Sequence, residues 1–470
     1  MAKLFDDFKK FKNRIALIDG KKKITFKKLI IIFDQLSNIL KKRSLILILC
    51  NNSLGSIISY LFCLYSNHVV ILMDKKISDY ELKKLVSLYK PNYIVSNELG
   101  IIKNVKKKIF KFNIFDSNLY SINSKKIQLK SNLQLLLPTS GSMSSAKFVR
   151  LSKSNLYRNT KSIIKYLKLN KKDMAITNMP FFYSYMLSII NTHLHVGGSI
   201  VISKDSIIQK KFWDVYSKNK ITSFNGVPYV YELLFKIGIN KILKKNLRYV
   251  TQAGGKLDET LKLRLWKIFE KKNIDFFVMY GQTEASPRIS YIKNNDLILK
   301  KGSIGKSIDG VKIFLKDYKN QKILTPYSEG NIYCIGKNVM LGYSKNLRDL
   351  NNCKNSEELN TGDIGFFDKD KYFFISSRAK RICKIYGIRL DLEDLEKRLL
   401  EYGINITSVS NDKKIGIFYN PSKKISLKKI REKVEKITNQ HSDIFLFTKL
   451  KNIPRTANQK IDYNSLKKLL

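Results

Sequence analysis

The chain has 470 residues, of which 44% are hydrophobic and five are cysteines, and its formal net charge is +50. This length and apolar content predict a globular protein of two to four domains or subdomains. The odd number of cysteines, without a C-x-x-C pair, argues against a disulfide framework or a zinc site and fits a reducing cytoplasm. Lysine is spread along the whole chain with no zinc-finger spacing, RNP-type motif or basic heptads, which disfavours a specific nucleic-acid site but leaves a general attraction to acidic partners.

The first 100 residues alternate between strand-like and helix-like segments. A short hairpin is expected around Gly20, and an apolar run at Leu45 to Cys50 predicts a buried strand. The charged N-terminus lacks an apolar leader, and the apolar tract Ile57 to Met73 is interrupted by Ser66 to His68, which suits a buried helix and strand better than a membrane span. The alternation predicts a parallel sheet covered on both faces, with helices at 26–40, 53–64 and 79–88 and further strands at 68–72 and 93–95.

An apolar run at Leu135 to Pro138 leads into the hydroxyl-rich segment Thr139 to Lys147. Backbone N–H groups and small hydroxyls can surround phosphate oxygens, and a closing lysine adds a positive charge beside them. The Walker pattern is a poor match, because Ala146 replaces its second glycine and Phe148 its hydroxyl residue, so an ordinary P-loop NTPase is disfavoured. The alternative is a solvated serine-rich turn.

A second α/β region follows, with helices at 154–167, 184–194 and 212–219 and strands at 174–178, 199–202 and 247–250, while 223–228 is expected to be a strand that runs into a turn. From Ile289 onward short strands and glycine turns predict a small all-β segment. Beyond Arg378 the pattern returns to an α+β domain of about ninety residues, with helices at 392–400 and 427–437 and strands at 404–411, 414–419 and 444–450.

Three further stretches carry candidate chemistry. Phe277 to Ala285 is an apolar strand that ends in Tyr-Gly-Gln-Thr-Glu. The aromatic ring could stack on a nucleotide base, and the hydroxyl and carboxylate oxygens could bind magnesium. The alternative is a strand that ends in a capping box. Asn360 to Gly365 places a carboxylate in a glycine turn that could accept hydrogen bonds from ribose hydroxyls, or simply form an Asp turn. Ile453 to Tyr463 holds one lysine before a terminal helix.

Together these stretches resemble the adenylate-forming superfamily of acyl-CoA synthetases, peptide-synthetase adenylation domains and luciferases. The family's phosphate loop falls on Thr139 to Lys147, its Y-G-x-T-E motif on Tyr280 to Glu284, and its T-G-D motif on Thr361 to Asp363. Its ribose-arginine motif falls on Arg378 to Gly387, and its P-R-T-x-x-G-K motif on Pro454 to Lys460. The motifs occur in family order over nearly the whole chain.

The resemblance implies an α/β fold: a large N-terminal domain, 1–377, of two α/β subdomains plus a small β-barrel at about 290–377, and a smaller mobile α+β C-terminal lid, 378–470. It also implies roles for individual residues. Catalysis would fall to Lys460, Thr283 and Glu284, the last two also as magnesium ligands, and the hinge to Lys380. The nucleotide would be bound by Thr139, Ser140, Gly141, Ser142, Lys147, Gly254, Gly255, Tyr280, Gly281, Asp363 and Arg378.

The implied reaction is the ATP-dependent activation of a carboxylic acid to an acyl-adenylate, with release of pyrophosphate, followed by transfer to a thiol. ATP and Mg²⁺ are the expected cofactors, with CoA or the phosphopantetheine of an acidic acyl carrier protein as acceptor. The acid is expected near Tyr183, Asn225 and Gly226, which could equally be core or turn residues. The alternatives are a catalytically degenerate nucleotide-binding protein on this fold and, as a different class, a basic nucleic-acid-binding protein.

Four glycines of the family pattern are absent. Ser144, Lys371, Ser377 and Gln459 stand in their places, and in the phosphate loop Met143 and Ala146 also depart from the pattern. Each lost glycine is expected to be unfavourable by about 1 kcal/mol wherever φ is positive. Every charged or hydroxyl residue with an expected direct role is nevertheless present.

Overall fold

The computed structural model describes residues 4–97, 109–138, 147–351, 356–378, 381–385, 388–411, 414–420, 426–438, 444–456 and 459–470. Contacts divide the chain into two compact units. The first comprises Met1–Ile313 and Cys334–Leu359, and the second comprises Phe314–Tyr333 and Asn360–Leu470. The expected boundary at residues 377 and 378 does not coincide with this division, and it stays a prediction.

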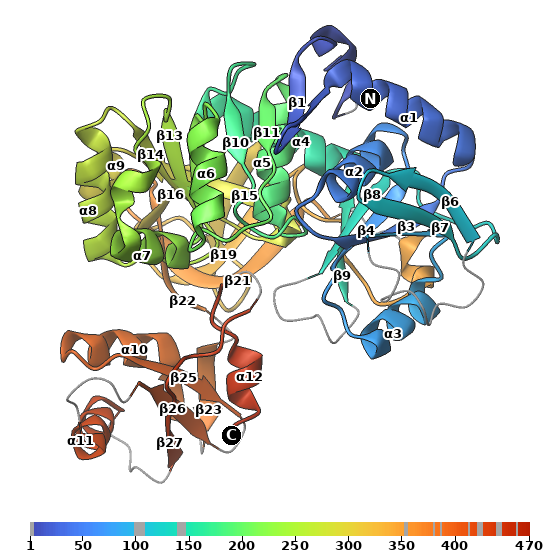
Figure 1. The fold of residues 1–470 in the computed structure, drawn as a ribbon. Coiled ribbons are helices and arrows are strands. Elements are labelled where there is room, and N and C mark those ends of the chain that lie inside the picture. The colour runs from blue at the N-terminus through green and yellow to red at the C-terminus, as the bar shows by residue number, and fades with distance from the viewer. Residues whose placement is uncertain are drawn as a thin grey trace. The chain divides into compact units, whose positions relative to one another are not determined.

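One sheet of the first unit is parallel at its centre and antiparallel at its edges (Figure 1). Its strands are β1 (Ile15–Asp19), β2 (Lys22–Thr25), β10 (Met174–Ile176), β11 (Ser199–Val201), β12 (Ser223–Gly226), β13 (Tyr249–Gln252), β14 (Asp275–Gly281), β15 (Arg288–Lys293) and β16 (Ser303–Ser307). They are ordered β2-β1-β11-β10-β12-β13-β14-β15-β16, with parallel pairing from β1 to β14. The pairs β1–β2, β14–β15 and β15–β16 are antiparallel.

A second sheet of the first unit has the order β20-β9-β8-β4-β3-β5-β7-β6. Its strands are β3 (Leu45–Cys50), β4 (Val69–Asp74), β5 (Tyr93–Ser96), β6 (Ile109–Ile114), β7 (Ser117–Ser121), β8 (Leu133–Pro138), β9 (Phe148–Ser152) and β20 (Tyr343–Ser344). The inner strands β8, β4, β3 and β5 are parallel, and all six residues of β3 are buried.

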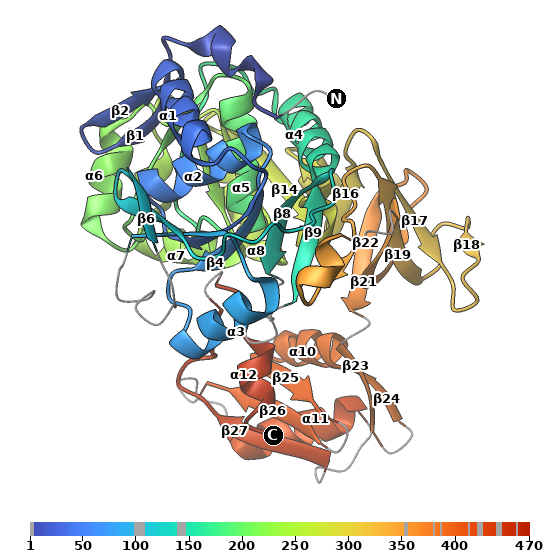
Figure 2. The ribbon, with the colours of Figure 1, turned by 90° about the vertical axis from the view of Figure 1, so that its right-hand side faces the viewer.

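Two almost wholly buried helices connect the sheets: α2 (Leu54–Tyr65) packs on β3 and β4, and α5 (Ser184–His195) packs on β10 and β11. They meet through a hydrogen bond from the Tyr60 hydroxyl to Asn191, 3.1 Å long. The outer faces are covered by other helices (Figures 1 and 2). The remaining helices of this unit are η1 (Asp6–Phe11), α1 (Phe26–Ile39), α3 (Asp79–Tyr89), α4 (Lys153–Leu167), α6 (Lys210–Lys218), α7 (Pro228–Ile237), η2 (Ile239–Ile242), α8 (Glu259–Glu270), η3 (Thr283–Ala285), α9 (Asp296–Leu299) and η4 (Leu347–Leu350).

The other strands and helices lie largely in the second unit. They are β17 (Val311–Lys316), β18 (Lys322–Ile323), β19 (Gly330–Gly336), β21 (Glu358–Phe367), β22 (Phe373–Arg378), β23 (Ile382–Ile385), β24 (Ile388–Asp391), α10 (Leu392–Glu401), β25 (Ile406–Ser410), β26 (Ile415–Tyr419), α11 (Leu427–Thr438), β27 (Phe445–Lys449) and α12 (Tyr463–Lys467). Strands β25, β26 and β27 form a sheet with one core against α10 and α11 and another against α12, because alternate side chains of β26 point to opposite faces.

The predicted α/β class is confirmed, with two corrections. The sheets are mixed rather than purely parallel. The N-terminal hairpin β1–β2 also joins the later sheet through β11, so the α/β regions are not two separate units along the chain. Helices α7 and α8 were not predicted; α7 begins at Pro228, which the sequence reading placed in a turn although proline is favoured at a first helical position.

Within the described residues, no helix combines the length and the apolar character that a membrane crossing needs. Four of the five cysteines are described, and all four are buried: Cys50, Cys63, Cys334 and Cys383. Burial raises the pKa of Cys50 and Cys63 well above the ordinary value, and that of Cys334 to about 12.

Candidate active site

One tyrosine joins two of the predicted phosphate and metal residues. Tyr343 on β20 pairs with Val149 of β9, two residues after Lys147. The Lys147 Nζ lies 3.7 Å from the centre of the Tyr343 ring, a cation–π geometry. The Tyr343 hydroxyl donates a hydrogen bond of 2.9 Å to Glu284 Oε1. Lys147 and Glu284, 137 residues apart in sequence, therefore lie on either side of the same side chain.

The Tyr343 hydroxyl remains a hydrogen-bond donor because its proton is held firmly. Partial burial and the adjacent Glu284 charge raise its pKa well above the ordinary value. The donated bond orients the Glu284 carboxylate, and the Glu284 carbonyl accepts a bond of 2.9 Å from the Met340 N–H. Tyr343 was not predicted as a site residue; its place beside Lys147 depends on the pairing of β9 with β20, which the local sequence does not reveal.

The loop after β14 is held tightly by its neighbours. A Cβ at Gly281 would lie 1.8 Å from the Pro287 carbonyl oxygen, so only glycine fits there. Thr283 Oγ1 and Ser184 Oγ are hydrogen-bonded at 3.1 Å, which ties the loop to the start of α5. The side chain of Asn338 donates to the carbonyls at positions 285 and 288. The predicted Tyr280 and Gly281 thus end β14, and Thr283 and Glu284 open the short helix η3 that follows directly.

The predicted acyl-pocket residues also come together, at the carboxyl ends of β12 and β13. Asn225 and Gly226 pair with Thr251 and Gln252 in parallel register, and the carboxyl ends of parallel strands are where open α/β sheets bind ligands. Tyr183 is the N-cap residue of α5 and is buried. Its hydroxyl lies so close to Gly254 that a Cβ there would be 2.3 Å away.

We expect Gly254→Ala to damage the pocket beyond an ordinary glycine substitution. Gly254 has φ +86°, and Gly302 has φ +84° with nothing within 4 Å of an added Cβ. Both alanine variants should lose about 1 kcal/mol of folding stability from the positive φ. Gly254→Ala must also displace Tyr183, so thermal unfolding should show a larger loss and the KM for the acid should rise. Equal effects of the two variants on KM would contradict this placement.

Gly255 of the first unit is exposed, and its carbonyl accepts a hydrogen bond of 2.8 Å from the Gln252 side chain. The other predicted residues that are described belong to the second unit. Asp363 lies on β21, is 5% exposed, and stands opposite Arg378 of β22 in the register. The Lys460 carbonyl accepts a hydrogen bond of 2.8 Å from the Thr456 N–H, and the Arg455 guanidinium donates to the Gln459 carbonyl. Thr139, Ser140, Gly141, Ser142 and Lys380 lie outside the described residues.

Two of the absent family glycines fall where glycine would be favoured. Lys371 and Gln459 both have φ +61°, so each is unfavourable by about 1 kcal/mol relative to glycine, as expected from the sequence. Ser377 lies within strand β22, where no such demand applies. Ser144 is outside the described residues.

The side chains that the structure describes do not by themselves form a magnesium site, so phosphate oxygens of a bound nucleotide would have to complete the coordination of Mg²⁺. No group of three or more His, Cys, Asp or Glu side chains within the described ranges could hold a metal ion. Mg²⁺ commonly binds through one or two carboxylates plus substrate phosphates and water. The Glu284 carboxylate and the Thr283 hydroxyl, in one short turn, fit that role.

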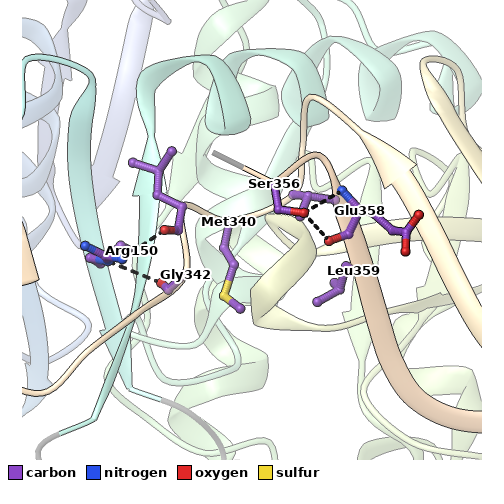
Figure 3. A pocket seen from close by; sticks show the side chains of 8 residues that line it. Arg150, Met340, Gly342, Ser356, Glu358 and Leu359 are labelled. Carbon is purple, nitrogen blue, oxygen red and sulfur yellow. Dashed lines mark hydrogen bonds between the residues drawn. The ribbon is translucent and has the colours of Figure 1, made fainter. Parts of the chain in front are cut away.

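A cavity of about 410 Å³ lies beside β9 (Figure 3). The Arg150 guanidinium donates to the carbonyls of Leu341 and Gly342, and the Ser356 hydroxyl donates to the Glu358 carbonyl. These polar groups are engaged within the protein. The cavity is therefore a less suitable place for a polar ligand than its size suggests.

A family model described as AMP-binding enzyme matches residues 4–344. The chain belongs to this family. The resemblance to adenylate-forming enzymes that the motifs indicated is thereby confirmed. The assigned roles of the individual residues stay predictions.

Curated relatives of this AMP-binding enzyme include the oxalate–CoA ligase of Saccharomyces cerevisiae, 26% identical over 275 residues, which are 58% of this chain and 49% of that protein. The probable 4-coumarate–CoA ligase 2 of Dictyostelium discoideum is 28% identical over 281 residues, 59% of this chain and 50% of that protein. The chain thus spans about half the length of the curated relatives it matches.

Solved structures agree on the fold. The o-succinylbenzoate-CoA synthetase MenE of Bacillus subtilis in complex with AMP has a TM-score of 0.78 at 20% identity, covering 99% of this chain and 97% of that one. ATP-bound MatB of Rhodopseudomonas palustris has a TM-score of 0.78 at 16% identity, covering 99% and 98%.

Proposed function

We propose that this AMP-binding enzyme activates a carboxylic acid with ATP and transfers the acyl group to a thiol. An oxygen of the acid bonds to the α-phosphorus while the bond to the departing pyrophosphate breaks; the thiol sulfur then bonds to the acyl carbon and AMP leaves. The observation that carries the proposal is the joining of Lys147 and Glu284 through Tyr343, beside the Thr283 turn. A cation and a carboxylate are thereby held next to each other for phosphate and magnesium.

Each residue would act by binding, orientation or charge. Lys147 would neutralise phosphate oxygens, and Tyr280 would stack on the base. Glu284 and Thr283 would hold magnesium, which when bound offsets phosphate charge. Lys460 would offset the negative charge that builds up on the α-phosphate as the acid attacks. Transfer of this kind needs positioning and charge neutralisation more than covalent help from the protein.

CoA is the acceptor that we favour, because curated relatives are named as CoA ligases. An acidic acyl carrier protein is the rival acceptor, and the net charge of +50 would favour its approach. If the carrier is used, thioester formation should slow as ionic strength rises. If thioester formation with the carrier is insensitive to salt and slower than with CoA, the carrier is excluded as the acceptor.

The proposal is tested by pyrophosphate release over a panel of short, long, aryl and amino acids, together with calorimetric titration of ATP. An active enzyme should release pyrophosphate with at least one acid and bind ATP. Binding of ATP without release for any acid would instead indicate a degenerate nucleotide-binding protein.

A further inference from the structure

An arginine that the sequence reading did not single out lies buried next to the predicted acyl pocket. Arg288 opens β15, opposite Gly281 of β14, and is 3% exposed. One of its Nη atoms donates to the Ser188 hydroxyl at 3.3 Å, and its guanidinium lies 4.9 Å from the centre of the Tyr185 ring. Its Nε has no hydrogen-bond partner.

The charge of Arg288 is not balanced by a carboxylate in the described part of the chain, where no ion pair includes this residue. The tyrosines and the histidine beside it supply no negative charge. Burial raises the pKa of Tyr166 and Tyr185, and that of Tyr183 to about 12, and burial lowers the pKa of His193. A guanidinium stays protonated, and burying a cation without a counter-charge is strongly unfavourable.

A small cavity reaches this guanidinium. It is lined by Arg288, Asn225, Tyr185 and Ser188 among others, and has a volume of about 10 Å³, room for about one water molecule. Asn225 is also buried, and its Nδ2 has no partner, because the Thr251 hydroxyl bonds to its Oδ1 at 2.6 Å. Two residues that each carry a buried N–H donor without a partner therefore line one cavity, and such donors call for an acceptor.

The position of this cavity relates it to the acid. Asn225 belongs to the predicted acyl pocket, and Tyr185 and Ser188 follow Tyr183 on α5. The β14 turn with Thr283 is tied to the same helix end through Ser184. A group bound at Arg288 would thus be the far end of a molecule whose reacting carboxylate lies near that turn.

We propose that Arg288 and Asn225 select an acid that carries a second carboxylate, so that the substrate is a dicarboxylic acid. This inference rests on the proposed function. The second carboxylate supplies both the missing negative charge and acceptors for the two donors. It needs more room than the 10 Å³ of this cavity, so the lining side chains must move to admit it. Affinity for a ligand that forms a buried ion pair falls strongly when either charge is removed, here the Arg288 guanidinium or the second carboxylate.

The test compares dicarboxylic acids of increasing length, each with its own monomethyl ester, which has the same chain but a neutral far end. Pyrophosphate release gives kcat/KM for both. The wild-type enzyme should prefer one dicarboxylic acid over its ester by about 30-fold or more. Arg288→Met should bring this ratio near one, and Arg288→Lys should restore part of it. A merely structural role would lower both rates and leave the ratio unchanged.

Arg158→Met, at an exposed arginine of α4, is the matched control and should leave the ratio as in the wild type. A second readout is the unfolding temperature, which the preferred dicarboxylic acid should raise in the wild type but not in Arg288→Met. Equal use of acid and ester by the wild type would overturn the inference, leave the proposed function intact, and mean that water alone occupies the cavity. If no acid releases pyrophosphate, the proposed function fails; the shift in unfolding temperature, measured with every dicarboxylic acid of the series and its ester, then decides for or against Arg288.

Discussion

Lys460→Ala should abolish carboxylate-dependent exchange between ATP and pyrophosphate, with a loss of about 10³-fold or more. The lysine would offset the negative charge that develops on the α-phosphate, and no uncharged side chain replaces that. The measurement is isotope exchange between pyrophosphate and ATP in the presence of the preferred acid. Retention of full exchange would remove Lys460 from its assigned role.

Two comparisons separate this effect from damage to the fold. Lys467→Ala, at an exposed lysine of α12, should exchange at the wild-type rate. Lys460→Ala supplied with ready-made acyl-adenylate should still form the thioester, because the charge is needed for the first step. Failure of this second reaction as well would indicate a general structural defect.

Glu284→Gln should lose the response to magnesium. Glutamine retains an oxygen that can accept the Tyr343 hydrogen bond but lacks the charge, so the position of the side chain is preserved while its attraction for Mg²⁺ falls. We expect the magnesium concentration for half-maximal rate to rise by about 100-fold or more, since even indirect partners of a metal ligand change affinity by 10- to 100-fold.

Glu270→Gln, at an exposed glutamate in α8, is the corresponding control and should leave the magnesium dependence unchanged. Tyr343→Phe, which frees the Glu284 carboxylate from its donor, should shift the dependence less than Glu284→Gln. A Glu284→Gln enzyme with the wild-type magnesium curve would place the metal on other residues.

Local pattern was sufficient for most elements of the fold. The apolar run at Leu45 to Cys50 is β3 with the predicted limits, and the helix expected at 79–88 is α3, extended by one residue. What the pattern could not give is strand order. Nothing in Ile15–Asp19 shows that β1 pairs with β11, 183 residues later, because such pairing is decided by packing between distant segments.

The residues of the candidate site also fall into two groups, those that sequence motifs predict and those that only the tertiary structure identifies. Motifs identified Tyr280 at the end of β14 and Thr283 and Glu284 in η3, which follows it directly. Tyr343 and Arg288 escaped notice, since a tyrosine in a short edge strand and an arginine after a proline are unremarkable until their neighbours are known. The one available signal was a charged residue at the start of the otherwise mostly apolar strand β15.

The buried thiols have a practical consequence for enzymology. Cys50, Cys63 and Cys334 are shielded from solvent and hold their protons well above neutral pH, so they are poor nucleophiles. A coloured thiol reagent added to quenched samples, to read the free CoA that remains, therefore meets little background from these three side chains in the native enzyme.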